Sequence, residues 1–227
     1  MTSADDRALA AAVLARSEWL GQGGRELADA FLAHGRFVPL TAGQWAHAEG
    51  DDEAGVLVVL RGALQIYCKA PGDREVLINH IGVGAALGQT TRFGGGPRLV
   101  TAIAAEDALV LQVSDRALSR IAHEAPRLWE AVSALLYLQL RNLLELVGAL
   151  AALPPRERLA RRLVQMARTS PQATLRVTQD ALGEMVGMTR KTANLHLAAL
   201  EREGLVRRAY GGLTITDLAG LRRVAGD

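Results

Sequence analysis

The segment Thr178–Leu205, TQDALGEMVGMTRKTANLHLAALEREGL, decides how this chain is interpreted. It predicts two helices joined by a tight turn. Thr178 and Thr189 can each cap the start of a helix, because a threonine hydroxyl accepts a backbone N–H that has no partner in the first turn. Gly187 falls between the two helices, where a positive φ costs glycine little. Gly204 stands where a helix C-terminus favours a left-handed residue.

The second predicted helix has one apolar face and one polar face. The apolar positions at helical spacing are Leu182, Met185 and Val186 in the first helix and Ala193, Leu197 and Leu200 in the second. Arg190, Lys191, Asn194 and Leu195 remain on the outer side of the second helix. A helix that presents Arg, Lys and Asn from its N-terminal half can contact base edges in a DNA major groove. An ordinary pair of packed helices with a solvated charged face is the alternative.

The residues after this segment predict a β-hairpin. Leu205–Tyr210 and Leu213–Thr216 have strand-like composition and flank Gly211-Gly212, which we expect to form a two-residue turn. The hairpin would be the wing of a winged helix-turn-helix, with two arginines near DNA phosphates. The residues predicted to contact DNA are Thr178, Thr189, Arg190, Lys191, Thr192, Asn194, Leu195, Arg207 and Arg208.

Charge is distributed unevenly along the 227 residues. Residues 1–155 carry 13 Lys and Arg against 17 Asp and Glu, a net charge of −4, whereas residues 156–227 carry 13 against 7, a net charge of +6. A basic C-terminal third is expected of a nucleic-acid-binding module joined to a different domain. Aromatic residues make up only 4% of the chain, so aliphatic and alanine side chains must form the core.

Cysteine content and the N-terminus indicate a cytoplasmic protein. Cys68 is the single cysteine, which excludes internal disulfides and four-cysteine metal or iron–sulfur sites. It follows a predicted strand and is either a half-buried structural residue or a redox thiol. The acidic start, MTSADDRALA, lacks the basic region of a secretory signal. No apolar run reaches about 18 residues, so no membrane span is expected.

The N-terminal half predicts helices followed by a β-barrel. Residues 4–34 have helical composition, interrupted at Gly21–Gly24. Short strand-like runs then alternate with glycine-containing turns, as in a sandwich or jelly roll. These runs are Val56–Leu60, Leu64–Tyr67, Val76–His80, Leu99–Ile103 and Ala108–Val113. A short helix is expected at Ser114–Ala122, and the fold class is α+β.

A long helix is predicted at about Pro126–Leu150. Leu136, Leu140, Leu143, Val147 and Leu150 recur at alternating spacings of four and three residues, as in the seam of a coiled coil. A second row, Leu135, Leu138, Leu144 and Leu146, could cover the barrel. A helix with two apolar faces requires two partners, here its own barrel and a second subunit. Burial within one subunit is the alternative. Leu153-Pro154-Pro155 should end the helix and act as a hinge before a further helix at 158–168.

This order of elements resembles the Crp/Fnr family of bacterial transcription regulators. The resemblance covers about residues 35–216 and is most specific in VTQDALGEMVGMTRKTANLHLAALEREGLV, AGVLVVLRGALQIY and VGAALGQ. It implies a β-roll sensor domain within residues 1–125, a dimerisation helix at 126–153 and a winged helix-turn-helix at 154–227. It also implies a homodimer on a near-palindromic double-stranded DNA site, with RNA polymerase as a possible partner.

Two departures from the family pattern bear on specificity. Arg190 matches the first arginine of the recognition helix in the cyclic-AMP-type members, but Lys191 stands where they have Glu, and Leu195 where they have a second Arg. Lysine cannot accept a hydrogen bond from a cytosine amino group. We therefore expect a different half-site, and we expect Arg190→Ala to abolish sequence-specific binding.

The positions that hold the effector in the family are also altered. The resemblance places them at Gly88, Gln89, Arg98, Leu99, Asn142 and Leu143. A Gly-Gln pair replaces the family's Gly-Glu, and Arg-Leu replaces Arg-Ser. The pair that contacts adenine aligns on Leu143-Leu144, which cannot hydrogen-bond a base. Cyclic AMP is therefore not the expected effector, and both the identity of an effector and its existence stay open. Arg98 is either a phosphate ligand or a solvated arginine beside the Gly94–Gly96 loop.

No other cofactor or activity is indicated. No cysteine cluster precedes Cys68, and the histidines are scattered at His34, His47, His80, His123 and His196, so no metal or haem site is expected. Glycine-rich P-loop, HExxH and GxSxG motifs are lacking, which argues against an enzyme. A sensor or interaction module that does not bind specific DNA is the alternative function. Activation and repression cannot be separated from the sequence.

Overall fold

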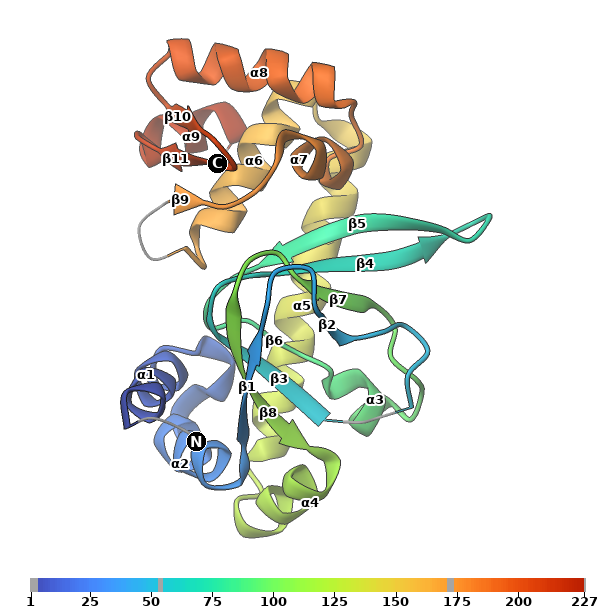
Figure 1. The fold of residues 1–227 in the computed structure, drawn as a ribbon, viewed down its shortest axis with the longest axis vertical. Helices are drawn as coiled ribbons and strands as arrows, with labels where there is room; N and C mark the ends of the chain where they lie inside the picture. The colour runs from blue at the N-terminus through green and yellow to red at the C-terminus, as the bar shows by residue number, and fades with distance from the viewer. Residues whose placement is uncertain (1–3, 53–54, 171–173, 227) are drawn as a thin grey trace. The chain divides into compact units, whose positions relative to one another are not determined.

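The structure is a computed structural model that describes residues 4–52, 55–170 and 174–226. The chain forms two compact units (Figure 1). The first contains residues 1–64 and 82–142, and the second contains residues 65–81 and 143–227. The β-hairpin segment 65–81 thus groups with the C-terminal residues, whereas we expected it within a segment ending at residue 125.

Helices at both ends of the first unit share one core with its main sheet. They are α1 (Ala4–Ala15), η1 (Glu18–Gly23), α2 (Gly24–His34) and α4 (Asp115–Glu124), and a further short helix, α3 (Gln89–Gly94), follows β6. Phe31 of α2 and Ile121 of α4 are fully buried in this core together with Leu111 from the sheet. The hydroxyl of Ser114 accepts a hydrogen bond from the Ala117 N–H at 3.3 Å, which caps α4. The helices expected at 4–34 and 114–122 are confirmed.

The strands of the first unit are antiparallel. They are β1 (Arg36–Leu40), β2 (Trp45–His47), β3 (Gly55–Arg61), β6 (Ala86–Leu87), β7 (Thr101–Ala104) and β8 (Ala108–Ser114). One sheet has the order β1-β8-β3-β6, and β2 pairs with β7. The buried run of β3 pairs with β8, with Val58 opposite Leu111. The expected strands at 56–60 and 108–113 are therefore confirmed.

Three strands and one boundary differ from expectation. β2 and β6 span only three and two residues, too few for a periodic pattern, and β1 contains Pro39. A proline is tolerated in β1 because this strand lies at the edge of its sheet. β7 begins at Thr101 rather than Leu99, because Arg98 exchanges backbone hydrogen bonds with the 50–51 turn just before it.

The long helix is α5 (Leu128–Ala152), and it ends just before Pro154-Pro155. Leu135 is buried against the first unit's core and Leu138 packs on it, as predicted for the covering row. Leu144 is 62% exposed, so its assignment to that row was wrong. The expected seam residues of α5 are all exposed: Leu136, Leu140, Leu143, Val147 and Leu150. The alternative of a helix buried within one subunit is therefore contradicted at these positions.

Within the described residues, α5 is also the helix whose length and apolar composition would suffice to cross a membrane. A single helix of this kind does not establish a membrane span, since the core helix of a soluble protein meets the same criteria. Glu130, Arg141 and Glu145 interrupt its sequence.

The second unit combines the hairpin with the C-terminal helices and a small sheet. Its elements are β4 (Leu64–Ala70, from Gln65 on), β5 (Arg74–Ile81), α6 (Pro155–Ala167), β9 (Thr174–Leu175), α7 (Gln179–Met185), α8 (Arg190–Arg202), β10 (Val206–Ala209), β11 (Gly212–Ile215) and α9 (Leu218–Ala225). The small sheet has the order β10-β11-β9. Cys68 is half-buried inside β4, rather than after the strand as we expected.

The hairpin packs on the helices through one buried leucine and three hydrogen bonds. Leu77 of β5 is buried in the same core as Leu159 and Leu163 of α6. Its N–H donates to a carboxylate oxygen of Glu184 in α7 at 2.8 Å. The buried guanidinium of Arg162 in α6 donates to Oδ1 of Asn79 at 2.7 Å and to the Ile78 carbonyl at 3.3 Å. Since backbone groups take part, the contact depends on strand geometry as well as side-chain identity.

Two buried histidines make stability depend on pH. Burial lowers the pKa of His47 to about 4, with a smaller effect of Arg98, and burial together with Arg162 lowers the pKa of His80 to about 4. In the unfolded chain both side chains have a pKa of about 6.5. Between these values the unfolded state binds more protons, so the free energy of unfolding falls as pH decreases through this window.

We expect each histidine to account for a loss of at most about 2 kcal/mol between pH 7 and about pH 5. Urea unfolding of the wild type, His47→Gln and His80→Gln at both pH values tests this. Each variant should lose less unfolding free energy than the wild type over the same interval. The exposed Ser119, which carries no group that titrates in this range, is replaced by Ala as the control and should leave the wild-type pH dependence intact; equal slopes in all four proteins would contradict the prediction.

Candidate nucleic-acid interface

Threonine caps fix the starts of both helices of the helix-turn-helix. The Thr178 hydroxyl accepts a hydrogen bond from the Ala181 N–H at 3.1 Å at the start of α7. The Thr189 hydroxyl accepts from the Thr192 N–H at 3.2 Å at the start of α8. Gly187 has a φ of +64° in the turn. The caps and turn predicted from the sequence are thus confirmed.

Gly183, inside α7, allows the two helices to approach closely, a role that we did not predict from the sequence. A Cβ at this position would lie 2.8 Å from the Met188 carbonyl oxygen and 3.3 Å from the Thr189 carbonyl carbon. A glycine in a helix interior is unfavourable by about 1 kcal/mol relative to alanine, so its presence was itself a signal of close packing. The start of α8 therefore depends on the absence of a side chain in α7.

The outer face of α8 is uncovered. Ala193, Leu197 and Leu200 are buried in the core of the second unit, as predicted. Arg190, Lys191, Asn194 and Leu195 are exposed, and Thr192 is half-buried. Arg190 forms a 3.3 Å ion pair with Asp180 of α7. Both partners are largely exposed, so the pair adds little stability and leaves the guanidinium accessible.

The wing is present, but its turn lies one residue earlier than predicted. β10 and β11 are antiparallel with Ala209 opposite Gly212, so the two turn residues are Tyr210 and Gly211. Gly212 instead begins β11, which pairs with β10 on one side and β9 on the other, and a Cβ at Gly212 would collide with the Leu175 carbonyl of β9. The prediction of a Gly211-Gly212 turn was wrong because no local pattern indicated that third strand.

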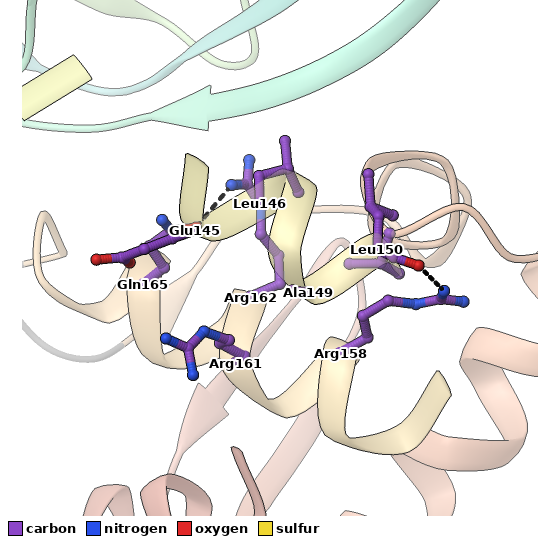
Figure 2. A pocket seen from close by; sticks show the side chains of 9 residues that line it. Glu145, Leu146, Ala149, Leu150, Arg158, Arg161, Arg162 and Gln165 are labelled. Atoms are coloured by element: carbon purple, nitrogen blue, oxygen red, sulfur yellow. Dashed lines mark hydrogen bonds between the residues drawn. The ribbon is translucent and has the colours of Figure 1, made fainter. Parts of the chain in front are cut away.

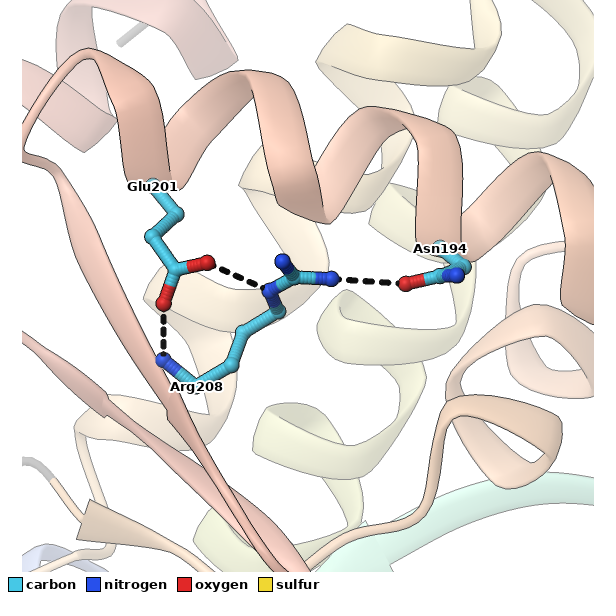
Figure 3. Close-up of polar contacts among 3 residues, drawn as sticks. All are labelled: Asn194, Glu201 and Arg208. Atoms are coloured by element: carbon cyan, nitrogen blue, oxygen red, sulfur yellow. Dashed lines mark hydrogen bonds and ion pairs between the residues drawn. The ribbon is translucent and has the colours of Figure 1, made fainter.

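The two wing arginines differ in their surroundings. Arg207 is exposed, whereas Arg208 lies along α8 between two of its side chains (Figure 3). Its Nε donates to Oε2 of Glu201 at 2.7 Å, and its Nη1 donates to Oδ1 of Asn194 at 2.7 Å. The Arg208 N–H also donates to Oε1 of Glu201. These hydrogen bonds from the Arg208 backbone and side chain lower the pKa of Glu201.

A basic pocket lies within the second unit where the end of α5 meets α6 (Figure 2). Its lining consists of Glu145, Leu146, Ala149, Leu150, Arg158, Arg161, Arg162, Gln165 and Val186. Arg158 donates to the Leu150 carbonyl at 3.3 Å, and Arg162 donates to Gln165 at 2.9 Å. Arg158 thereby satisfies a carbonyl at the C-terminal end of α5, where cations are favoured. Burial lowers the pKa of Arg162 to about 10.

In the first unit, three of the expected effector positions lie close together. Arg98 is 5% exposed and donates to the Gly55 carbonyl at 3.1 Å. Gly88, with a φ of +98°, lies against the same guanidinium, which a Cβ would strike. The alternative of a solvated Arg98 was therefore wrong. Gln89 is 1% exposed and donates to the Gln139 side chain of α5, which in turn donates to the Ala86 carbonyl at 3.0 Å.

The other expected effector positions have different surroundings. Leu99 and Leu143 are 62% and 52% exposed, and Asn142 is half-buried. Within the described part of the chain, no group of three or more His, Cys, Asp or Glu side chains is arranged to hold a metal ion.

Comparison with known proteins identifies the family. Residues 37–125 match the cyclic nucleotide-binding domain and residues 157–224 match the Crp-like helix-turn-helix domain. A CRP-like cAMP-activated global transcriptional regulator of Mycobacterium tuberculosis is 27% identical over 195 residues, which cover 83% of this chain and 87% of that protein.

Solved structures show the same fold. A CRP-family transcriptional regulator from Thermus thermophilus matches with a TM-score of 0.67 and 25% identity, over 84% of this chain and 97% of that one. FixK2 from Bradyrhizobium japonicum matches with a TM-score of 0.72 and 19% identity, over 84% and 96%. The fold is therefore that of a helix-turn-helix regulator with a cyclic-nucleotide-binding-type β-roll. The chain belongs to the Crp/Fnr family of transcription regulators.

The close approach at Gly183 leads to a prediction. Gly183→Ala should lower the free energy of unfolding of the second unit by about 1–3 kcal/mol, because the methyl group overpacks the contact with Met188 and Thr189. Thermal unfolding followed by circular dichroism measures this. Gly148→Ala in α5, where an added Cβ meets nothing within 4 Å, is the control and should be neutral or slightly stabilising. Equal melting temperatures for Gly183→Ala and the wild type would contradict the prediction.

Proposed function

We propose that the protein is a homodimeric regulator that binds a near-palindromic double-stranded DNA site in the cytoplasm. The observation that carries this proposal is the uncovered outer face of α8, held by a buried inner face and a capped N-terminus. Arg190, Lys191, Asn194 and Leu195 would enter the major groove, where such side chains contact base edges. Thr178, Thr189, Thr192 and Arg207 would lie near phosphates, with Arg208 beside Asn194 on the same surface. The alternative function, a sensor module that does not bind specific DNA, does not explain why this face of α8 carries exposed Arg, Lys and Asn side chains.

Dimerisation is supported by the exposed apolar row of α5. Five seam residues, Leu136, Leu140, Leu143, Val147 and Leu150, are between 39% and 55% exposed. A row of large apolar side chains at coiled-coil spacing is typical of a helix that pairs with a second copy. Paired long helices would place two copies of α8 on one DNA molecule, and two half-sites follow from that symmetry.

The effector is proposed to be a ligand other than cyclic AMP. The Mycobacterium tuberculosis relative is described as cAMP-activated. In this chain Leu143 and Leu144 occupy the positions that would face an adenine base, and neither can form a hydrogen bond. Gly88, Gln89 and Arg98 remain the candidate effector contacts, with Leu99 and Asn142 as the further positions that the family pattern implies. Contact with RNA polymerase is proposed from the family alone.

Arg190→Ala should abolish sequence-specific binding, because it removes the guanidinium best placed to form two hydrogen bonds with a guanine edge. Selection of bound DNA from a random pool, with the purified wild type at near-physiological salt, first defines the site. Gel-shift titration of wild type and variant on that site then measures the loss. Arg176→Ala, on the same unit but away from α8 in sequence, is the control. Unchanged affinity and specificity in Arg190→Ala would overturn the assignment.

Leu140→Glu should convert the dimer into a monomer, because it places a charge in the centre of the seam. Sedimentation velocity of the wild type and the variant measures the mass directly. Leu144→Glu makes the same change at an equally exposed leucine outside the seam and should leave the dimer largely intact. A monomeric wild type, or dissociation of both variants to the same extent, would count against the proposed seam.

A further inference from the structure

We infer that Arg208 determines which base Asn194 recognises, by holding the asparagine amide in one orientation. With its oxygen engaged by Arg208, Asn194 presents its amide nitrogen to the DNA and favours guanine over adenine at the contacted base pair. This inference rests on the proposed sequence-specific binding and deepens it. Arg208 acts here as a positioning residue, through Asn194, rather than as a phosphate contact.

The orientation of the Asn194 amide follows from hydrogen-bond chemistry. A guanidinium group has only donors, so the atom that faces Nη1 of Arg208 at 2.7 Å must be the amide oxygen. The nitrogen of the same amide then points away from Arg208 (Figure 3). A rotated amide would place two donors against each other and lose a charge-assisted hydrogen bond.

Arg208 is itself fixed at its other end. Glu201, two turns further along α8, accepts a hydrogen bond from the Arg208 backbone N–H and one from Nε, both at 2.7 Å. The guanidinium therefore bridges Glu201 and Asn194 along one side of the helix (Figure 3). The Glu201 carboxylate holds both the backbone and the side chain of Arg208. Since this backbone belongs to β10, the strand fixes the position of Nη1.

This arrangement changes what an asparagine can recognise. A free asparagine binds adenine with two hydrogen bonds, its oxygen accepting from N6 and its nitrogen donating to N7. In this protein the oxygen is directed at Arg208, so the amide offers donors to the DNA. Guanine presents two acceptors, N7 and O6, on the same edge, whereas adenine presents one acceptor beside a donor. The bridge thus disfavours adenine and favours guanine.

The test compares base preferences by random-pool selection followed by competition binding. The base pair contacted by Asn194 is the one at which Asn194→Ala loses all preference. Wild type should favour guanine there. Arg208→Ala should raise the ratio of adenine to guanine about fivefold or more in both half-sites, as expected when a bidentate contact becomes available. Arg208→Lys keeps the charge but cannot bridge Glu201 and Asn194, so it should show the same gain of adenine.

Arg207→Ala is the matched control. It removes a neighbouring exposed arginine and should weaken binding to all sequences with a smaller salt dependence, while the base preference stays unchanged. Thermal unfolding verifies that each variant is folded. If Arg208→Ala leaves the wild-type motif unaltered, or if the wild type prefers adenine at this position, the inference is overturned. The proposed sequence-specific binding would then still stand. Absence of any motif in the wild type contradicts the proposed sequence-specific binding and overturns the inference with it.

Discussion

The packing of α8 against the second unit is the constraint on which the rest of the DNA-binding surface depends. One face of this helix is buried through Ala193, Leu197 and Leu200, and the opposite face must stay accessible to fit a groove. Such a helix gains little stability from its outer side. Its position is therefore fixed by its inner face, its N-cap and its packing against the neighbouring helix α7. The close approach at Gly183 supplies that neighbour contact, since it brings the backbone of α7 to the turn before α8.

Polar contacts then define how the surface is presented. Arg190 is held loosely by an exposed ion pair that DNA phosphates and bases can displace at small cost. Arg208 is held by three hydrogen bonds to two residues of α8, which is a much firmer arrangement. The net charge of +6 on residues 156–227 already counts the Arg208–Glu201 pair as zero, so it comes from the other basic side chains of the module.

Most of the correct predictions from the sequence rest on local patterns. The helix-turn-helix, both threonine caps, the long helix and the buried strands β3 and β8 all follow from spacing within short windows, and the structure agrees with each. The predictions that were wrong depend on contacts between residues far apart in the chain. Gly212 belongs to a strand because β9 passes beside it, and Leu144 is exposed because the helix leaves the core of the first unit beyond Leu138. The bridge from Arg208 to Asn194 spans 14 positions and joins a strand to a helix, so no periodic pattern encodes it.

Two candidate effector positions of the β-roll are buried, in contrast to the exposed outer side chains of α8. Arg98 and Gln89 are buried and hydrogen-bonded to the protein, so a ligand that uses them must displace these contacts or add to them. Gln89 donates to Gln139, and Gln139 lies on α5, the helix that also carries the exposed apolar row. A ligand that competes for the Gln89 amide would therefore change a hydrogen bond to α5 directly. The altered Gly-Gln and Arg-Leu pairs argue only against cyclic AMP, whereas this hydrogen bond connects the buried Gln89 amide to the long helix.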